Sequence, residues 1–186
     1  KTRTAEKNTK TMTEGGPSSN SFNGTRVYLV QHGLAEPEDV NPERPLNAQG
    51  VAETQVLAEY LPQHETVVEE AAQMGLPLEI WHSGKLRAQQ TAELVAKSLV
   101  PEGWETHVKK VDGMNPKDPA ERFLTDALRK PQRKCVMLCG HLPFLQELAT
   151  LMVSAADGSN APSMPPFSNS CLFRFDDDSA RARSAF

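Results

Sequence analysis

Three histidines in this sequence directly follow short apolar runs of the kind that form buried strands. His32 comes after RVYLVQ, His82 after LEIW and His141 after CVMLCG. Arg44 is on the loop after the first run, and Arg87 lies one turn into the helix predicted after the second. The carboxyl ends of the strands in an open α/β sheet define the edge where ligands bind. The pattern therefore predicts that two or three imidazoles and two guanidinium groups gather at that edge.

Imidazole and guanidinium groups, with no cysteine nucleophile and no pair of carboxylates, are typical of phosphoryl transfer. A neutral imidazole can attack phosphorus and hold the phosphoryl group covalently. Guanidinium groups bind phosphoryl oxygens through paired hydrogen bonds and stabilise the charge of the transition state. His32 and His141 are the stronger candidates, because the adjacent Gly33 and Gly140 let the backbone approach a ligand closely.

A metal-dependent hydrolase is an alternative that uses the same residues, with His32, His82 and His141 as ligands. It is the less favoured hypothesis, because no aspartate or glutamate accompanies them in a facial-triad or two-metal arrangement. His82 is more simply explained as a side chain that turns off a strand end. We therefore expect neither a metal ion nor a cofactor.

Elsewhere the chain alternates predicted strands with predicted helices, which indicates an α/β domain. Residues 1–24 contain almost no large apolar side chain and are expected to form a disordered tail, so that the domain spans 25–186. Asn47 is a predicted N-cap of the first helix. The predicted apolar face of that helix consists of Ala52, Val56, Leu57, Tyr60 and Leu61. The predicted strands cover residues 26–30, 78–81, 106–111, 135–139 and 171–175.

Composition and charge narrow the function classes. The chain has 186 residues, of which 38% are hydrophobic, and a net charge of −4. A chain of this length can bury a substantial core as one domain. The acidic balance, with basic residues spread along the chain, argues against a nucleic-acid partner. Neither a membrane span nor a signal peptide is evident, so we expect no membrane partner and a cytoplasmic location.

Four motifs occur in order between residues 26 and about 153: VQHG, ERPLNAQG, SGKLRAQQTAE and LCGHLPFL. Together they make the chain resemble the histidine phosphatase superfamily, the phosphoglycerate mutase-like proteins, and within it the small SixA-type phosphohistidine phosphatases. The resemblance implies a single three-layer domain with a mostly parallel central sheet flanked by helices. It also implies that His32 is the phosphorylated nucleophile. Arg44 and Arg87 would be phosphate ligands, and His141 would contact the phosphoryl group. Ser83 would line the phosphate pocket.

Gln31 departs from the family motif, which has arginine before the histidine. A neutral hydrogen bond contributes roughly 1 kcal/mol where a charge-assisted one contributes roughly 2 or 3. The loss of this difference in stabilisation, about 1 to 2 kcal/mol, would slow the chemistry on the order of tenfold if it falls wholly on the transition state. Gln31 is thus expected to bind phosphate weakly in an attenuated enzyme. The same substitution supports the alternative of a degenerate module that binds phosphorylated ligands without turnover.

The lack of an evident general acid is the second departure from the family pattern. Larger members of the superfamily protonate the leaving group with a carboxylic acid, whereas Glu36 and Asp112 are candidates here by position only. A phosphoramidate leaves as an imidazole that water can protonate, so a dedicated acid is less necessary. The helix-rich insertions that close over small metabolites in larger members of the superfamily are not evident in this sequence. These points favour a phosphohistidine-bearing protein as partner. The alternative is a small phosphorylated substrate, in which case the protein would be a phosphomonoesterase.

Overall fold

The computed structural model describes residues 25–64, 67–73, 75–99, 106–129, 135–157, 166–175 and 183–184. The tail predicted over residues 1–24 lies outside this part of the chain. Within the described residues, no helix is both long and apolar enough to cross a membrane.

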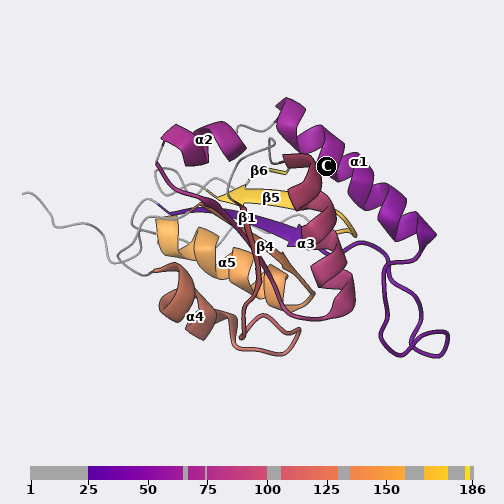
Figure 1. The fold of residues 1–186 in the computed structure, drawn as a ribbon. Helices are drawn as coiled ribbons and strands as arrows, with labels where there is room; N and C mark the ends of the chain where they lie inside the picture. The colour runs from indigo at the N-terminus through magenta and orange to yellow at the C-terminus, as the bar shows by residue number, and fades with distance from the viewer. Residues whose placement is uncertain are drawn as a thin grey trace, which may run out of the picture.

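A six-stranded sheet with the order β3-β2-β4-β1-β5-β6 forms the centre of the fold (Figure 1). The first four strands in that order run parallel, and β5 and β6 pair antiparallel to their neighbours. All six residues of β4 are buried, as expected of a parallel strand that has helices on both sides. The strands are β1 (Arg26–Gln31), β2 (Leu78–His82), β3 (Thr106–Lys110), β4 (Cys135–Gly140), β5 (Leu172–Phe175) and β6 (Arg183–Ser184).

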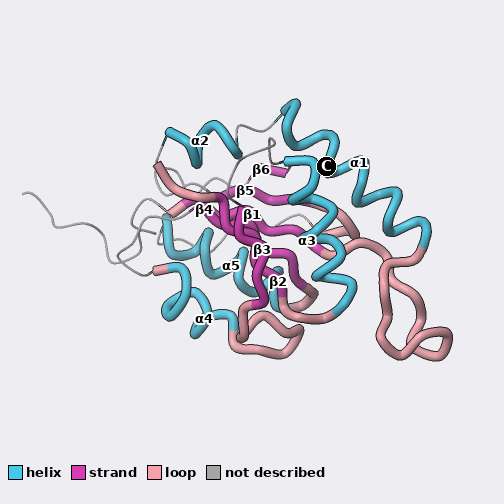
Figure 2. Tube along the Cα trace, viewed as in Figure 1, coloured by secondary structure: helices cyan, strands magenta, loops and turns pink. Residues whose placement is uncertain are grey.

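Helices cover both faces of the sheet (Figure 2). One apolar core lies between the sheet and α1, α2 and α3, and the other lies between the sheet and α4, η1 and α5. Along β1, Tyr28 and Val30 enter the first core, while Val27 and Leu29 enter the second. The predicted three-layer, mostly parallel α/β domain is confirmed. The helices are α1 (Ala48–His64), α2 (Val67–Gln73), α3 (Leu86–Leu99), α4 (Ala120–Phe123) and α5 (Phe144–Asp157), with a π-helical turn η1 (Leu124–Leu128) after α4.

The apolar face predicted for α1 is partly wrong. The helix does begin after Asn47, whose side-chain Oδ1 accepts the Gly50 N–H at 2.8 Å. Val56, however, is 57% exposed, and Ala52 is also exposed. The face that packs against the sheet and α3 follows the spacing i, i+3, i+4 and i+7 and has a polar member. Its buried residues are Thr54, Leu57, Ala58 and Leu61.

Strand register brings the ends of β1 and β4 together. Gln31 pairs with Gly140, the last residue of β4. His32, the first residue after β1, donates its backbone N–H to the Gly140 carbonyl at 3.1 Å. His32 and His141 therefore leave the sheet from neighbouring strand ends. On β2 the register is shifted, because His82 pairs with Cys139.

Candidate active site

Two of the three predicted histidines meet at the edge of the sheet. The imidazole centroids of His32 and His141 lie 4.8 Å apart, with the ring planes tilted by 58°. His141 is almost completely buried, whereas His32 is partly exposed. The site therefore has one imidazole that solvent can reach and a second that is buried next to it.

The hydrogen bonds of His32 determine which ring nitrogen can act as a nucleophile. Its Nδ1 lies 2.7 Å from the Gly33 carbonyl oxygen, and because a carbonyl can only accept, Nδ1 carries the proton. Nε2 is then the nitrogen with the lone pair. It accepts a hydrogen bond from Arg87 Nε at 3.1 Å. The backbone thus sets the tautomer, and Arg87 places a positive charge beside Nε2.

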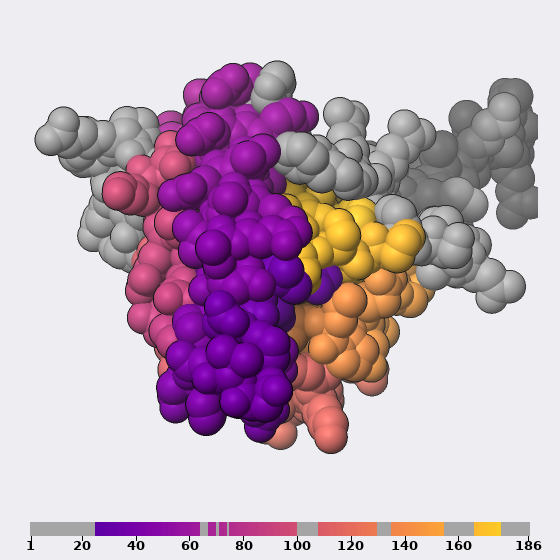
Figure 3. All heavy atoms as spheres, turned by 90° about the vertical axis from the view of Figure 1, so that its right-hand side faces the viewer, coloured from indigo at the N-terminus to yellow at the C-terminus, as the bar shows by residue number. Residues whose placement is uncertain are grey.

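Arg44 approaches the same edge on the loop between β1 and α1. An antiparallel bridge between Ala35 and Leu46 closes this loop, and α3 holds it through a 2.7 Å bond from Leu46 N–H to Gln90 Oε1. Arg44 has a φ of 49°, and its Nε donates to the Glu36 carbonyl at 3.2 Å. In Figure 3, which faces the right-hand side of Figure 1, this loop and the start of α1 form the lower front of the molecule.

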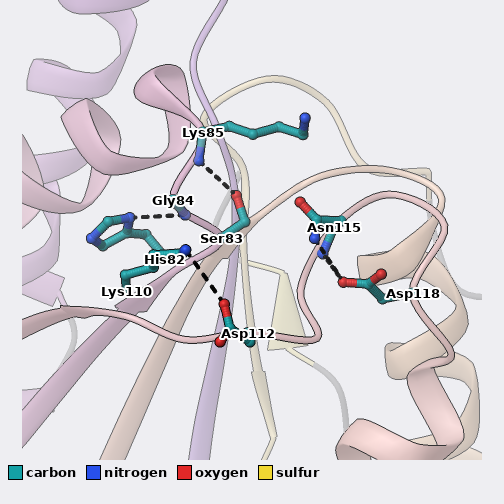
Figure 4. A network of polar contacts seen from close by, with 8 residues as sticks. All are labelled: His82, Ser83, Gly84, Lys85, Lys110, Asp112, Asn115 and Asp118. Atoms are coloured by element: carbon teal, nitrogen blue, oxygen red, sulfur yellow. Dashed lines mark hydrogen bonds and ion pairs between the residues drawn. The ribbon is translucent and has the colours of Figure 1, made fainter.

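Ser83 links the end of β2 to His141. Its Oγ lies 2.6 Å from His141 Nε2, and both residues are buried. The same Oγ accepts the backbone N–H of Lys85 at 3.4 Å (Figure 4). The sequence predicted Ser83 at the pocket, and the structure places its hydroxyl against the second histidine.

Comparison with known proteins identifies the fold. No protein-family model matches the sequence, and no curated protein matches it significantly. Among solved structures, an Agrobacterium tumefaciens protein described as the phosphohistidine phosphatase SixA is 26% identical, with a TM-score of 0.59 over 88% of this chain and 96% of that chain. A protein histidine phosphatase SixA in complex with tungstate is 20% identical, with a TM-score of 0.54 over 87% of this chain and 95% of that one. The fold is that of the histidine phosphatase superfamily.

The histidine phosphatase fold also includes enzymes for small substrates. A mycobacterial glucosyl-3-phosphoglycerate phosphatase, solved with VO3, is 14% identical to this chain. Its TM-score is 0.51, over 87% of this chain and 98% of that protein. The recognition of this superfamily and of SixA-type proteins from four sequence motifs is confirmed by these neighbours.

Burial keeps both histidines of this histidine phosphatase fold in the neutral form. Desolvation lowers the pKa of His32 to about 4, and the charges of Arg87 and Arg44 act in the same direction. Desolvation also lowers the pKa of His141 to about 3, with His32 and Arg87 as the next causes. At pH 7 the Nε2 lone pair of His32 is therefore unprotonated, as a nucleophile requires.

Gln31 directs its side-chain amide toward the segment before β5. Its Nε2 donates to Asn169 Oδ1 at 2.9 Å, and its Oε1 is buried with no hydrogen-bond partner among the described residues. In this arrangement one amide hydrogen is used within the protein. The phosphate contact predicted for Gln31 would have to come from the second hydrogen of the same amide group.

His82 does not join the other two histidines. It lies on the same face of β2 as Ile80, which packs in the core beneath α1 and α3. Its Nδ1 accepts the Gly84 N–H at 3.2 Å, and its ring lies on the opposite side of the strand end from the Ser83 hydroxyl (Figure 4). The three-histidine ligand set is therefore not formed. Within the described residues, no group of three or more histidine, cysteine, aspartate or glutamate side chains is arranged to hold a metal ion.

The two acids that the sequence put forward lie in different surroundings. Asp112 has a side chain that is 95% exposed and lies 3.5 Å from Lys110 Nζ in a surface ion pair (Figure 4). Glu36 contacts Arg44 through its backbone carbonyl. Asp112 is therefore a solvated surface charge, and Glu36 is partly buried on the loop that carries Arg44.

Thr91 is a supporting residue of the site that the sequence analysis missed. Its buried hydroxyl accepts the Gly33 N–H at 3.1 Å and donates to the Arg87 carbonyl at 2.8 Å. It therefore ties the backbone that holds His32 to the helix that carries Arg87. A signal was present in the sequence, because Thr91 lies one helical turn after Arg87 on the same face of α3.

Proposed function

We propose that this protein is a phosphatase that acts through a covalent phosphohistidine on His32 Nε2. The observation that carries the proposal is a neutral His32 whose proton is on Nδ1 and whose Nε2 lies 3.1 Å from Arg87 Nε. Together with His141 and Arg44, these residues match the requirements for an attack by nitrogen on phosphorus.

The reaction consists of two displacements. His32 Nε2 attacks the phosphorus of the substrate, a P–N bond forms at His32, and the bond from phosphorus to the leaving group breaks with its electron pair. Arg44 and Arg87 bind the phosphoryl oxygens, and His141 donates to one of them. Water then attacks phosphorus, the bond to Nε2 breaks, and inorganic phosphate leaves. Throughout, the proton stays on Nδ1, which donates it to the Gly33 carbonyl in a hydrogen bond, so His32 is restored as the same tautomer.

We propose phosphohistidine carried by another protein as the substrate. Because Asp112 is solvated and paired with Lys110, a substrate whose leaving group needs no dedicated acid fits best. The leaving imidazole of a phosphoramidate takes its proton from water. The 26% identical SixA neighbour supports this substrate class. A small phosphate ester is the alternative substrate, and the cytoplasm remains the location expected from the sequence.

A phospho-ligand binding module is the second candidate function. Gln31 supports it, because its amide is engaged with Asn169 and supplies no charge to the pocket. In that case Arg44 and Arg87 would hold a phosphoryl group that His32 does not take up.

Phosphoryl transfer to the protein can be tested directly. We expect incubation with a phosphohistidine peptide to give an acid-labile, alkali-stable phosphoryl group on His32, detected by mass spectrometry, and to release phosphate with or without EDTA. Phosphate monoesters offered at the same concentration should turn over more slowly. No label, together with thermal stabilisation by inorganic phosphate, would instead support the binding module. Faster turnover of the esters would contradict the proposed substrate, and loss of activity in EDTA would contradict a metal-independent reaction.

Replacing Gln31 with arginine should increase activity. An added charge changes one hydrogen bond to the phosphoryl group from neutral to charge-assisted, a gain of roughly 1 to 2 kcal/mol, which corresponds to about tenfold in kcat/KM. Gln31→Met, which has similar length and no charge, is the matched control and should show no gain. An unchanged kcat/KM in a folded Gln31→Arg protein would refute the charge argument.

A further inference from the structure

The hydroxyl of Ser83 has both a donor and an acceptor role available in the buried site. It accepts the Lys85 backbone N–H at 3.4 Å and lies 2.6 Å from His141 Nε2. The backbone amide can only donate, so the hydrogen of the Ser83 hydroxyl is not needed there. It can point at His141 Nε2, which then acts as the acceptor.

The other ring nitrogen of His141, Nδ1, has no hydrogen-bond partner among the described residues. This nitrogen is buried, and the whole residue is 1% exposed. A neutral imidazole has one protonated nitrogen and one with a lone pair. If Nε2 accepts from Ser83, the proton is on Nδ1, and the site contains a buried N–H donor that has no acceptor. Such a group is costly to leave unsatisfied unless a ligand completes it.

We propose that Ser83 is a positioning residue that holds His141 in the tautomer with the proton on Nδ1, so that this N–H donates to a phosphoryl oxygen held at His32. The proposal rests on the proposed function. The rings of His32 and His141 are 4.8 Å apart between centroids, close enough for a group on one to contact the other. In this proposal Ser83 acts through His141, whose Nε2 its hydroxyl contacts at 2.6 Å.

The other neutral tautomer of His141 would have the opposite effect on phosphoryl binding. If Nε2 donated to the Ser83 oxygen, Nδ1 would turn a lone pair toward the phosphoryl oxygens, which are themselves acceptors. A pocket of that kind would repel the group that Arg44 and Arg87 attract. Burial lowers the pKa of His141 to about 3, so the ring does not take up a second proton at pH 7. It must therefore adopt one of the two neutral tautomers.

The tautomer can be read from the chemical shifts and couplings of the ring nitrogens. In a two-bond proton–nitrogen NMR spectrum of the full chain at pH 7, we expect His141 to have a protonated Nδ1 and an unprotonated Nε2. Ser83→Ala should move both nitrogens toward averaged shifts and lower kcat/KM for the phosphohistidine peptide by about fivefold to tenfold. Ser83→Thr, which keeps the hydroxyl, should restore both readouts. A wild-type spectrum with Nε2 protonated overturns the proposal, as does a Ser83→Ala protein whose His141 shifts are unchanged.

Ser170→Ala is the matched control, because Ser170 is a buried serine whose Oγ contacts Thr54 Oγ1 at 3.2 Å. Its removal should leave the His141 shifts and the activity unchanged. If Ser83→Ala does not fold, the wild-type spectrum still decides between the two tautomers. The spectrum needs no turnover, so it is independent of the phosphoryl-labelling experiment. A protein with Nδ1 protonated that never becomes labelled would fail as an enzyme while the tautomer assignment stands.

Discussion

Replacing His32 with asparagine is expected to lower kcat/KM for a phosphohistidine peptide by about a thousandfold or more, as loss of a nucleophile does in other covalent enzymes. The asparagine amide can still donate to the Gly33 carbonyl, which His32 Nδ1 contacts at 2.7 Å, so the local backbone should be retained. The nitrogen that forms the P–N bond is lost. Phosphate release and the mass of the intact protein are the two measurements, and the labelled species should be missing.

His82→Asn is the matched control for this substitution. His82 is the last residue of β2 and is buried, and the asparagine side chain can replace its acceptor for the Gly84 N–H. The activity of the His82→Asn protein should stay within about a factor of three of the wild type, because a single neutral hydrogen bond contributes little free energy. Turnover that survives in His32→Asn would exclude the covalent mechanism, whereas a collapse of activity in His82→Asn would mean that His82 itself contributes to the site.

Arg87→Ala is expected to lower kcat/KM by about a hundredfold to a thousandfold, the usual effect of removing a group that stabilises transition-state charge. Two functions are lost together: binding of phosphoryl oxygens, and the bond from Nε to His32 Nε2. Arg87→Lys keeps the charge but not the planar pair of donors, so it should recover only part of the loss. Steady-state kinetics of both variants with the phosphohistidine peptide would measure the loss in kcat/KM and the part that lysine recovers.

The same substitution has a readout in the ionisation of His32. The positive charge of Arg87 lowers the pKa of that imidazole, after burial as the main cause. Removing the charge should raise the pKa, so that NMR titration shows protonation beginning at a higher pH than in the wild type. Arg122→Ala is the matched control, because Arg122 is an exposed arginine paired with Asp126 at 3.3 Å. Equal kinetics in Arg87→Ala and Arg122→Ala would contradict a role for Arg87 in the site.

The sequence was informative where local chemistry and chain direction are enough. Apolar runs that end in a polar residue predict parallel strands whose ends share an edge, and β1 and β4 do place His32 beside His141. Arg87 could be predicted for the same reason, since one helical turn after a strand end brings a side chain back over that edge. The three-layer architecture followed from the alternation of strands and helices and from the motifs.

Other features depended on register and packing, which no local pattern determines. His82 ends its strand one residue before the neighbouring strand does, opposite Cys139, and strand alternation turns it toward the α3 side. The buried face of α1 includes Thr54 and omits Val56, because the contacts with α3 select a stripe that hydrophobicity alone does not.

By itself, then, the sequence determined which residues could perform phosphoryl transfer and at which edge of the sheet they would be found. Only the tertiary structure decided how their hydrogen bonds are distributed: His32 Nδ1 to Gly33, Gln31 to Asn169, and Ser83 to His141. The physical reason is that each of these bonds, apart from the first, joins residues far apart in the chain. Which partner a donor meets is settled when the sheet and its loops pack, and that choice sets the tautomers on which the proposed chemistry depends.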